Sequence, residues 1–392
     1  MDKLIIEGGR PLAGLVRVSG AKNSVLPILA ATILAEGPVQ LRNVPELRDV
    51  STMAKLLEEM GAVTSSAEEY KVDASSLSSF RAPYELVKTM RASFLVLGPL
   101  LTKYGKAEVS LPGGCAIGAR PVNLHIKGLE AMGAKIQVES GYVKARAPQG
   151  LKGAEIFLEI ASVGATENLI MAAVLAEGKT VIHNAAEEPE ITDLITFLMK
   201  MGAKISGAGT SVVEIEGVRS LRSISHSIIG DRVEAGTFLI ACAALGGEIE
   251  VQGFDPNHLT VVLEKLKMSG ANLEISQDSV KLRMSLSRPE PVDIETGVYP
   301  GFPTDMQAQY MVLNCIASGK SVIQERIFEN RFLHVQELSR LGAVIELRGN
   351  STAVVTGVNK LTAAQVMATD LRASSSLVIA ALIAQGKTVI DR

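Results

Sequence analysis

The sequence predicts an α/β protein made of two similar domains, each of three repeated helix–strand units around buried helices. Two recurring segments predict this fold. An amphipathic segment ends in a Gly-Ala pair five times, at intervals of 68 to 72 residues. A segment rich in Ala, Leu and Ile ends in Gly six times, and a β-branched stretch follows it each time. Self-similarity at a fixed period of this length indicates a repeat architecture.

The six Ala- and Leu-rich segments are expected to be buried helices, because apolar residues occur on all their sides. They cover residues 23–37, 91–105, 165–178, 234–247, 306–319 and 373–386. The five Gly-Ala segments are expected to be outer helices, and each Gly is expected just past the helix end with a positive φ. They cover residues 53–62, 124–134, 194–203, 261–271 and 335–343. One unit therefore runs helix, strand, helix, strand, strand over about 70 residues.

Three units predict a first domain at residues 22–229, and residues 1–21 plus 230–392 predict the second. A chain of 392 residues is also too long for one ordinary core. Two N-terminal strands, LIIEG and GLVRVSG, lie outside the first unit, and we expect them to complete later ones. The repeat spacing would place the sixth Gly-Ala helix near position 410, beyond Arg392. We therefore expect the sixth unit to be incomplete at the C-terminus of this chain.

Composition excludes several classes of function. The net charge is −3, aromatic residues make up 4% and Trp is absent, so neither a basic footprint nor a stacking platform for nucleic acid is expected. The three cysteines do not form a disulfide framework, and the five histidines show no metal-ligand spacing. The N-terminus has no signal-peptide pattern, and no apolar run could span a membrane. We expect a soluble cytoplasmic protein with no metal and no other cofactor.

One cysteine lies in an unusual setting. Cys115 occupies the loop LPGGCAIGARP, five residues before Arg120, whereas Cys242 and Cys315 lie in apolar segments. A neighbouring guanidinium favours the thiolate form, and reactive cysteines lie in electropositive, partly exposed settings. The alternative is an ordinary surface cysteine in a turn. The GKT and GKS triplets are not phosphate-binding P-loops, because none has a glycine five residues earlier. No G-x-G-x-x-G follows a predicted strand, so a dinucleotide-binding site is not expected either.

Polar and charged residues interrupt the starts of several apolar helices. Lys22 and Asn23 stand at one helix start, where anions are favoured, and Arg91 stands before another. Asp305 follows two prolines, and Arg331 and Arg372 flank later apolar segments, the second beside Asp370. Helix caps or salt bridges are the alternative for each. Together with the Cys115 loop they supply four arginines, a lysine, two carboxylates and a thiol.

The chain closely resembles the enolpyruvyl transferases, and among them the enzymes that use UDP-N-acetylglucosamine. The resemblance covers the whole chain and is carried by GAKN, LPGGCAIGARPVNLHI, SVGATEN, FPTDMQAQ, ENRF and ATDLRAS. It implies an inside-out α/β barrel. It also implies transfer of enolpyruvyl from phosphoenolpyruvate to the 3′-hydroxyl of UDP-N-acetylglucosamine, with release of phosphate. This is the first committed step of bacterial peptidoglycan synthesis, and no metal is required.

The same resemblance implies roles for individual residues. Cys115 would protonate the methylene carbon of phosphoenolpyruvate and can form a covalent adduct, and fosfomycin alkylates it. Asp305 would take the proton of the 3′-hydroxyl, with Lys22 and Arg120 also in the catalytic set. The phosphoenolpyruvate site would comprise Lys22, Asn23, Arg120, Arg331 and Arg372. The UDP-N-acetylglucosamine site would comprise Arg91, Arg120, Pro121, Val122, Asn123, Leu124, Ser162, Val163, Gly164, Asp305 and Ile327.

Two departures from the family pattern carry expectations of their own. The family usually has Lys where this chain has Ile160, which predicts a modest change in the uridine contact or replacement by another residue. Family members continue for roughly 25 residues past the final VDR motif, with an arginine that contacts phosphate, so we expect impaired catalysis in a chain ending at Arg392. Two alternative functions remain open at this point. They are a shikimate-type enolpyruvyl transferase, which lacks the cysteine loop, and a non-catalytic UDP-sugar-binding paralogue.

Overall fold

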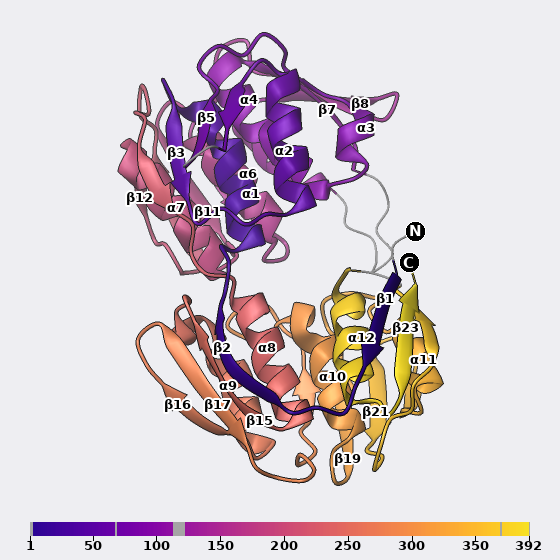
Figure 1. Ribbon diagram of the computed structural model, residues 1–392. Coiled ribbons are helices and arrows are strands. Elements are labelled where there is room, and N and C mark those ends of the chain that lie inside the picture. Colours follow the sequence, from indigo (N-terminus) through magenta and orange to yellow (C-terminus); the bar gives the residue numbers. More distant parts are fainter. Residues whose placement is uncertain (1–2, 67–68, 113–121, 369–370, 392) are drawn as a thin grey trace. The chain divides into compact units, whose positions relative to one another are not determined.

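In the part of the chain that the structure describes, six small sheets enclose buried helices, three sheets in each of two domains (Figure 1). The computed structural model describes residues 3–66, 69–112, 122–368 and 371–391, without the side chains of 371–373. Within these limits the first domain comprises residues 19–112 and 122–229, and the second comprises residues 3–18 and 230–391. Each domain is considered by itself below.

The three sheets of the first domain share one strand order. A first strand runs parallel to a second, which pairs antiparallel with a third, which pairs antiparallel with a fourth. In this order the sheets are β14 (Ser225–Ser227), β3 (Val39–Arg42), β5 (Tyr70–Asp73) and β4 (Val63–Ser65); β6 (Arg81–Ala82), β7 (Lys106–Ser110), β9 (Tyr142–Arg146) and β8 (Lys135–Glu139); and β10 (Glu155–Phe157), β11 (Lys179–His183), β13 (Val212–Glu216) and β12 (Lys204–Ser206).

The second domain repeats this order in two of its sheets, and the third shows its first three strands among the described residues. Its sheets are β2 (Leu12–Arg17), β15 (Gly247–Gln252), β17 (Ser279–Met284) and β16 (Asn272–Ile275); β18 (Ile294–Glu295), β19 (Lys320–Gln324), β21 (Thr352–Thr356) and β20 (Val344–Arg348); and β22 (Gln365–Met367), β23 (Lys387–Asp391) and β1 (Lys3–Glu7). The N-terminal strands do complete later units, as predicted. β2 pairs in parallel with β15, and β1 pairs antiparallel with β23.

The helices divide into the two predicted kinds. The buried ones are α1 (Lys22–Ala31), α4 (Leu97–Tyr104), α6 (Val163–Ala173), α8 (Arg232–Leu245), α10 (Gln307–Cys315) and α12 (Leu371–Ile383). The outer ones are α2 (Arg48–Glu59), α5 (Asn123–Ala131), α7 (Pro189–Met201), α9 (Thr260–Met268) and α11 (Val335–Arg340), with a short α3 (Tyr84–Val87). All five glycines of the Gly-Ala pairs have positive φ, between 89° and 113°, which side chains other than glycine rarely adopt.

Four short 3₁₀ helices also occur in the described part: η1 (Thr32–Leu34), η2 (Arg91–Val96), η3 (Pro256–Leu259) and η4 (Thr304–Met306). The single helix predicted over 91–105 is wrong in detail, because η2 precedes α4 there. Pro99 lacks the N–H that would continue an α-helix back through Leu95. The break leaves the Gly98 N–H free to donate to the Asn168 side chain at 2.6 Å. A Cβ at Gly98 would lie only 2.4 Å from that amide oxygen, so this contact requires glycine.

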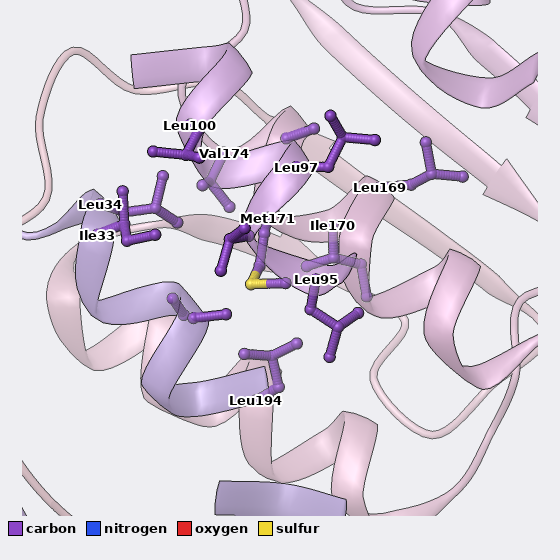
Figure 2. Close-up of a cluster of buried hydrophobic side chains, with 14 of the residues drawn as sticks. Ile33, Leu34, Leu95, Leu97, Leu100, Leu169, Ile170, Met171, Val174 and Leu194 are labelled. Atoms are coloured by element: carbon purple, nitrogen blue, oxygen red, sulfur yellow. The ribbon is translucent and has the colours of Figure 1, made fainter. Parts of the chain in front are cut away.

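The core of the first domain is aliphatic (Figure 2). α6 is buried without interruption from Ala165 to Ala173, and it packs against both α1 and α4. Met171 is fully buried, and Figure 2 shows its sulfur near the centre of this cluster. A flexible thioether side chain suits the irregular spaces of such a core.

Met171→Ala is expected to lower the free energy of unfolding by about 2–5 kcal/mol, because it removes buried contacts and leaves a cavity. Denaturant unfolding measures this loss. The matched control is Met199→Ala on α7, where the side chain is 49% exposed and the expected change lies within about 0.5 kcal/mol. Equal losses in the two variants would contradict the packing that Figure 2 shows.

Candidate active site

The predicted site residues fall into one group in each domain. Lys22, Asn23, Arg91, residues 122–124 and residues 162–164 belong to the first domain, and Asp305, Ile327 and Arg331 belong to the second. Cys115, Arg120 and Pro121 lie outside the described residues. Arg372 is the second residue of α12, but its side chain is among those not described.

Lys22 and Asn23 open α1. The residue before the helix is Ala21, and no side chain caps the helix start, so the ordinary capping explanation for these two residues is wrong. The Lys22 ammonium lies 3.2 Å from the Asp49 carboxylate in α2. Asp49 was missed in the sequence, because nothing local in α2 marks a partner for a residue 27 positions earlier. This pair fixes a cation at a helix N-terminus, where anions are also favoured by the helix dipole.

A buried carboxylate holds α1 in place. Asp193 of α7 accepts hydrogen bonds from the Ser24 hydroxyl at 2.5 Å, His226 Nε2 at 2.9 Å and the Ile229 N–H at 3.3 Å. Lys200 lies 3.2 Å from His226 Nδ1. Because a lysine can only donate, Nδ1 accepts and Nε2 carries the proton given to Asp193. Ser24 is thereby anchored one residue from Asn23.

In the first domain, the described residues implied for the nucleotide sugar lie in or next to η2, α5 and α6, and the Asn168 side chain connects these three helices. Asn168 of α6 donates to the Phe94 carbonyl at 3.4 Å and to His125 Nδ1 at 3.0 Å, and it accepts from the Gly98 N–H. Phe94 lies in η2, which begins at Arg91, and His125 follows Asn123 and Leu124 in α5. This buried network therefore ties η2, α5 and α6 together.

His125 lies under the start of α6. A Cβ placed on Gly164 would lie 3.5 Å from the imidazole, and the Phe94 ring meets the imidazole edge-on. Ser162 caps α6 by accepting from the Ala165 N–H, so its capping role is real. Burial, together with the positive charge of Arg91, lowers the pKa of His125 to about 3. The imidazole is thus neutral at physiological pH, and it can accept from Asn168.

The depressed pKa of His125 predicts a pH dependence of stability. The unfolded chain binds a proton near pH 6.5, whereas the folded protein does so only near pH 3, so the folded state loses stability as the pH falls below about 6.5. His125→Gln should reduce the slope of unfolding free energy against pH, between pH 6 and 5, by about 1.4 kcal/mol per pH unit. Urea unfolding at several pH values measures this slope, and an unchanged slope would contradict the assignment.

Ile160 is 65% exposed, between β10 and α6. Its neighbour Glu159 pairs with Lys127 of α5 at 2.6 Å. Lys127 follows Asn123 by four residues, which places the two side chains on one face of α5. Position 160 carries no cation, and the changed uridine contact or its replacement by another residue stays a prediction. Sequence alone could not pair Lys127 with a residue 32 positions away.

Asp305 and Arg331 form an ion pair in the second domain. Arg331 donates from Nη2 to the Asp305 carboxylate at 2.7 Å. Pro303 and Met306 precede η4 and α10, so Asp305 is not the capping residue of either helix. Arg331 is 4% exposed, and its guanidinium lies 5.4 Å from the centre of the Phe328 ring. A buried guanidinium beside an accessible carboxylate suits recognition of an anion next to a proton acceptor.

The described residues contain neither a cluster of potential metal ligands nor a helix suited to span a membrane. No three His, Cys, Asp or Glu side chains among them gather as a metal site would require. In the same part of the chain, no helix combines the length and apolar character needed to cross a bilayer.

Comparison with known proteins finds similarity to enolpyruvyl transferases over nearly the whole chain. The family model described as EPSP synthase (3-phosphoshikimate 1-carboxyvinyltransferase) matches residues 6–392. Two proteins named UDP-N-acetylglucosamine 1-carboxyvinyltransferase, from Shewanella amazonensis and Shewanella piezotolerans, are each 58% identical to this chain. All of this chain and 94% of each relative are covered.

Two solved structures share the fold. The enolpyruvyl transferase NikO from Streptomyces tendae matches with a TM-score of 0.88 at 24% identity, over 100% of this chain and 93% of that one. An EPSP synthase from Acinetobacter baumannii matches with a TM-score of 0.75 at 18% identity, over 99% and 93%. The predicted inside-out α/β fold is confirmed. The chain belongs to the enolpyruvyl transferase family, in which EPSP synthase and UDP-N-acetylglucosamine 1-carboxyvinyltransferase are also found.

Proposed function

We propose that this protein transfers the enolpyruvyl group of phosphoenolpyruvate to the 3′-hydroxyl of UDP-N-acetylglucosamine and releases phosphate. The observation that carries the proposal is the 58% identity, over the whole chain, to two enzymes named for this reaction. The Asp305–Arg331 pair supports it, because it sets a carboxylate beside a buried cation. The Lys22–Asp49 pair supports it as well, with a second cation at the start of α1.

The residues suit an addition followed by an elimination. Asp305 accepts the proton of the 3′-hydroxyl as the oxygen bonds to C2 of phosphoenolpyruvate. Cys115 gives a proton to C3, which becomes a methyl group in a tetrahedral intermediate. The C2–O bond to phosphate then breaks, C3 loses a proton, and phosphate leaves. Lys22, Asn23, Arg120, Arg331 and Arg372 hold the phosphate and carboxylate groups throughout.

The implied sugar site belongs to the same proposal. Arg91, Val122, Asn123, Leu124, Ser162, Val163, Gly164 and Ile327 would contact UDP-N-acetylglucosamine, together with Arg120, Pro121 and Asp305. The Asn168–His125 network of the first domain ties together η2, α5 and α6, the elements that begin at Arg91, Asn123 and Val163. We place the reaction in the cytoplasm, as the first committed step of peptidoglycan synthesis, which links the protein to cell shape and division.

Phosphate release with alternative acceptors tests the proposal. The chain should release phosphate from phosphoenolpyruvate with UDP-N-acetylglucosamine and not with shikimate 3-phosphate. Activity with shikimate 3-phosphate alone would establish the shikimate-type function instead. Binding of the nucleotide sugar with no phosphate release would identify a non-catalytic paralogue.

Mass spectrometry tests the role of Cys115 separately. Fosfomycin should add its mass once, at Cys115, faster in the presence of UDP-N-acetylglucosamine. Cys242 and Cys315 are buried, and burial raises the pKa of the first thiol to about 11 and of the second to about 12, so they serve as internal controls. Modification of either control cysteine in place of Cys115 would refute the assignment.

A further inference from the structure

One buried carboxylate of the second domain, that of Glu325, accepts four hydrogen bonds. Glu325 directly follows β19 and is 2% exposed. Its Oε1 accepts from the Thr296 hydroxyl at 2.9 Å, the Ile327 N–H at 2.8 Å and the Phe328 N–H at 3.2 Å. Its Oε2 accepts from the Thr304 hydroxyl at 2.9 Å. A buried carboxylate is tolerated when donors satisfy it in this way.

Three of the four donors come from the two segments that carry the second-domain site, and the fourth, Thr296, directly follows β18. Thr304 precedes Asp305 in η4, and Ile327 and Phe328 begin the turn that leads to Arg331. The two segments also meet directly, because Arg331 contacts both the Asp305 carboxylate and the Phe328 ring. Glu325 therefore closes a ring of contacts around the Asp305–Arg331 pair.

The turn after β19 depends on this carboxylate for its backbone. The Arg326 N–H donates to the Thr296 hydroxyl at 2.9 Å, and the next two N–H groups donate to Glu325. Thr296 is 2% exposed, so the groups at the centre of this network have little access to water. A buried N–H that loses its acceptor destabilises the fold by its full desolvation penalty, which exceeds the net contribution of a typical hydrogen bond. The turn would move if the carboxylate were removed.

We propose that Glu325 is a positioning residue for the transfer reaction: it sets Asp305 on one side and Ile327 with Arg331 on the other. The inference rests on the proposed function. Glu325 is assigned no contact with substrate, and its effect passes through the two segments that it joins. Catalytic groups must be held close to their productive geometry, and a shift of 1 Å can cost about 10²-fold in rate.

Two threonine variants separate the two sides of the carboxylate. Thr304→Val removes the bond nearest Asp305 and should lower kcat about tenfold, with the KM for UDP-N-acetylglucosamine unchanged. Thr296→Val removes the hydroxyl that bonds both Glu325 and the Arg326 N–H, and it should raise that KM several-fold, with a smaller change in kcat. A purely structural role would change thermal stability in both variants without this split. Wild-type kcat and KM in both variants would overturn the proposal.

Substitution of Glu325 itself gives the larger effect. Glu325→Ala should lower kcat by about 10²-fold, because both segments lose their common acceptor. Glu325→Gln should stay within about tenfold of wild type, since its carbonyl oxygen can serve the two N–H groups while its NH₂ donates to Thr304. Equal turnover losses in the Ala and Gln variants would count against positioning by hydrogen bonds. If Glu325→Ala does not fold, the threonine split and Glu325→Gln still decide the question.

Asn314 provides a matched control in the same domain. It is 1% exposed near the other end of α10, and it bonds the Val292 N–H at 3.2 Å and the Val292 carbonyl at 2.9 Å. Asn314→Ala should lower the unfolding temperature and leave turnover within about threefold of wild type. An equal turnover loss in Asn314→Ala and Glu325→Ala, at similar unfolding temperatures, would overturn the inference. Failure of the proposed function is distinguishable, because the unaltered chain would then release no phosphate.

Discussion

Asp305→Ala is expected to reduce the turnover of phosphoenolpyruvate with UDP-N-acetylglucosamine by a factor of about 10²–10⁴. The carboxylate is the proton acceptor proposed for the 3′-hydroxyl, and it is not needed to cap η4 or α10. Binding of the nucleotide sugar should remain largely intact, because most of its proposed contacts lie in the first domain. Phosphate release measures turnover, and isothermal titration with UDP-N-acetylglucosamine measures binding.

A second variant separates loss of the base from loss of the ion pair. Asp305→Ala leaves the buried Arg331 without this carboxylate, which can itself disturb the site. Asp305→Asn keeps a carbonyl oxygen for the guanidinium but cannot take a proton from an alcohol, so its turnover loss should match that of the Ala variant. The control is Asp255→Ala, which removes the cap of η3 and should cost about 1 kcal/mol of stability with normal turnover. Wild-type turnover in Asp305→Asn would refute the assignment of a general base.

The repeated architecture was predictable because it depends on local chemistry. A helix that ends in a left-handed residue needs glycine, so Gly61, Gly202 and the equivalent positions record each outer helix in the sequence. Apart from β2, the first strands of the sheets were not predicted in the same way. β14 and β18 contain three and two residues, too short to show alternation. β14 also pairs with β3, about 185 residues earlier in the chain, and local patterning carries no record of such a pairing.

The candidate site was predictable where residue type and family motif point to chemistry, as for Lys22, Asp305 and Arg331. It was not predictable where a role arises from distant partners. Glu325 looks like any glutamate after a strand, and its role depends on Thr296, 29 residues away. His125 looked like one of five scattered histidines, and only its burial against Asn168 and Arg91 reveals why it stays neutral. The roles of Glu325 and His125 therefore depend on hydrogen bonds between distant segments, which the sequence does not record.

Arg331→Ala is expected to lower kcat/KM for phosphoenolpyruvate by about 10²–10³-fold, the range seen when one preorganised donor to a developing anion is removed. The guanidinium is 4% exposed and lies between Asp305 and Phe328, so its geometry is set before substrate arrives. A buried, preoriented cation is worth more to an anion than the same charge in water. Steady-state phosphate release at varied phosphoenolpyruvate concentration measures the loss.

Arg331→Lys distinguishes charge from geometry. Lysine restores a positive charge but not the planar pair of N–H donors, so it should recover only part of the loss. Full recovery would show that charge alone is required, and wild-type kcat/KM in Arg331→Ala would remove Arg331 from the anion site. The matched control is Arg326→Ala in the same turn, where an exposed guanidinium pairs with Glu295 at 3.3 Å. An exposed ion pair contributes about 1 kcal/mol or less, so Arg326→Ala should keep normal turnover. This result would show that Arg331 acts through its buried position and not through the total charge of the turn.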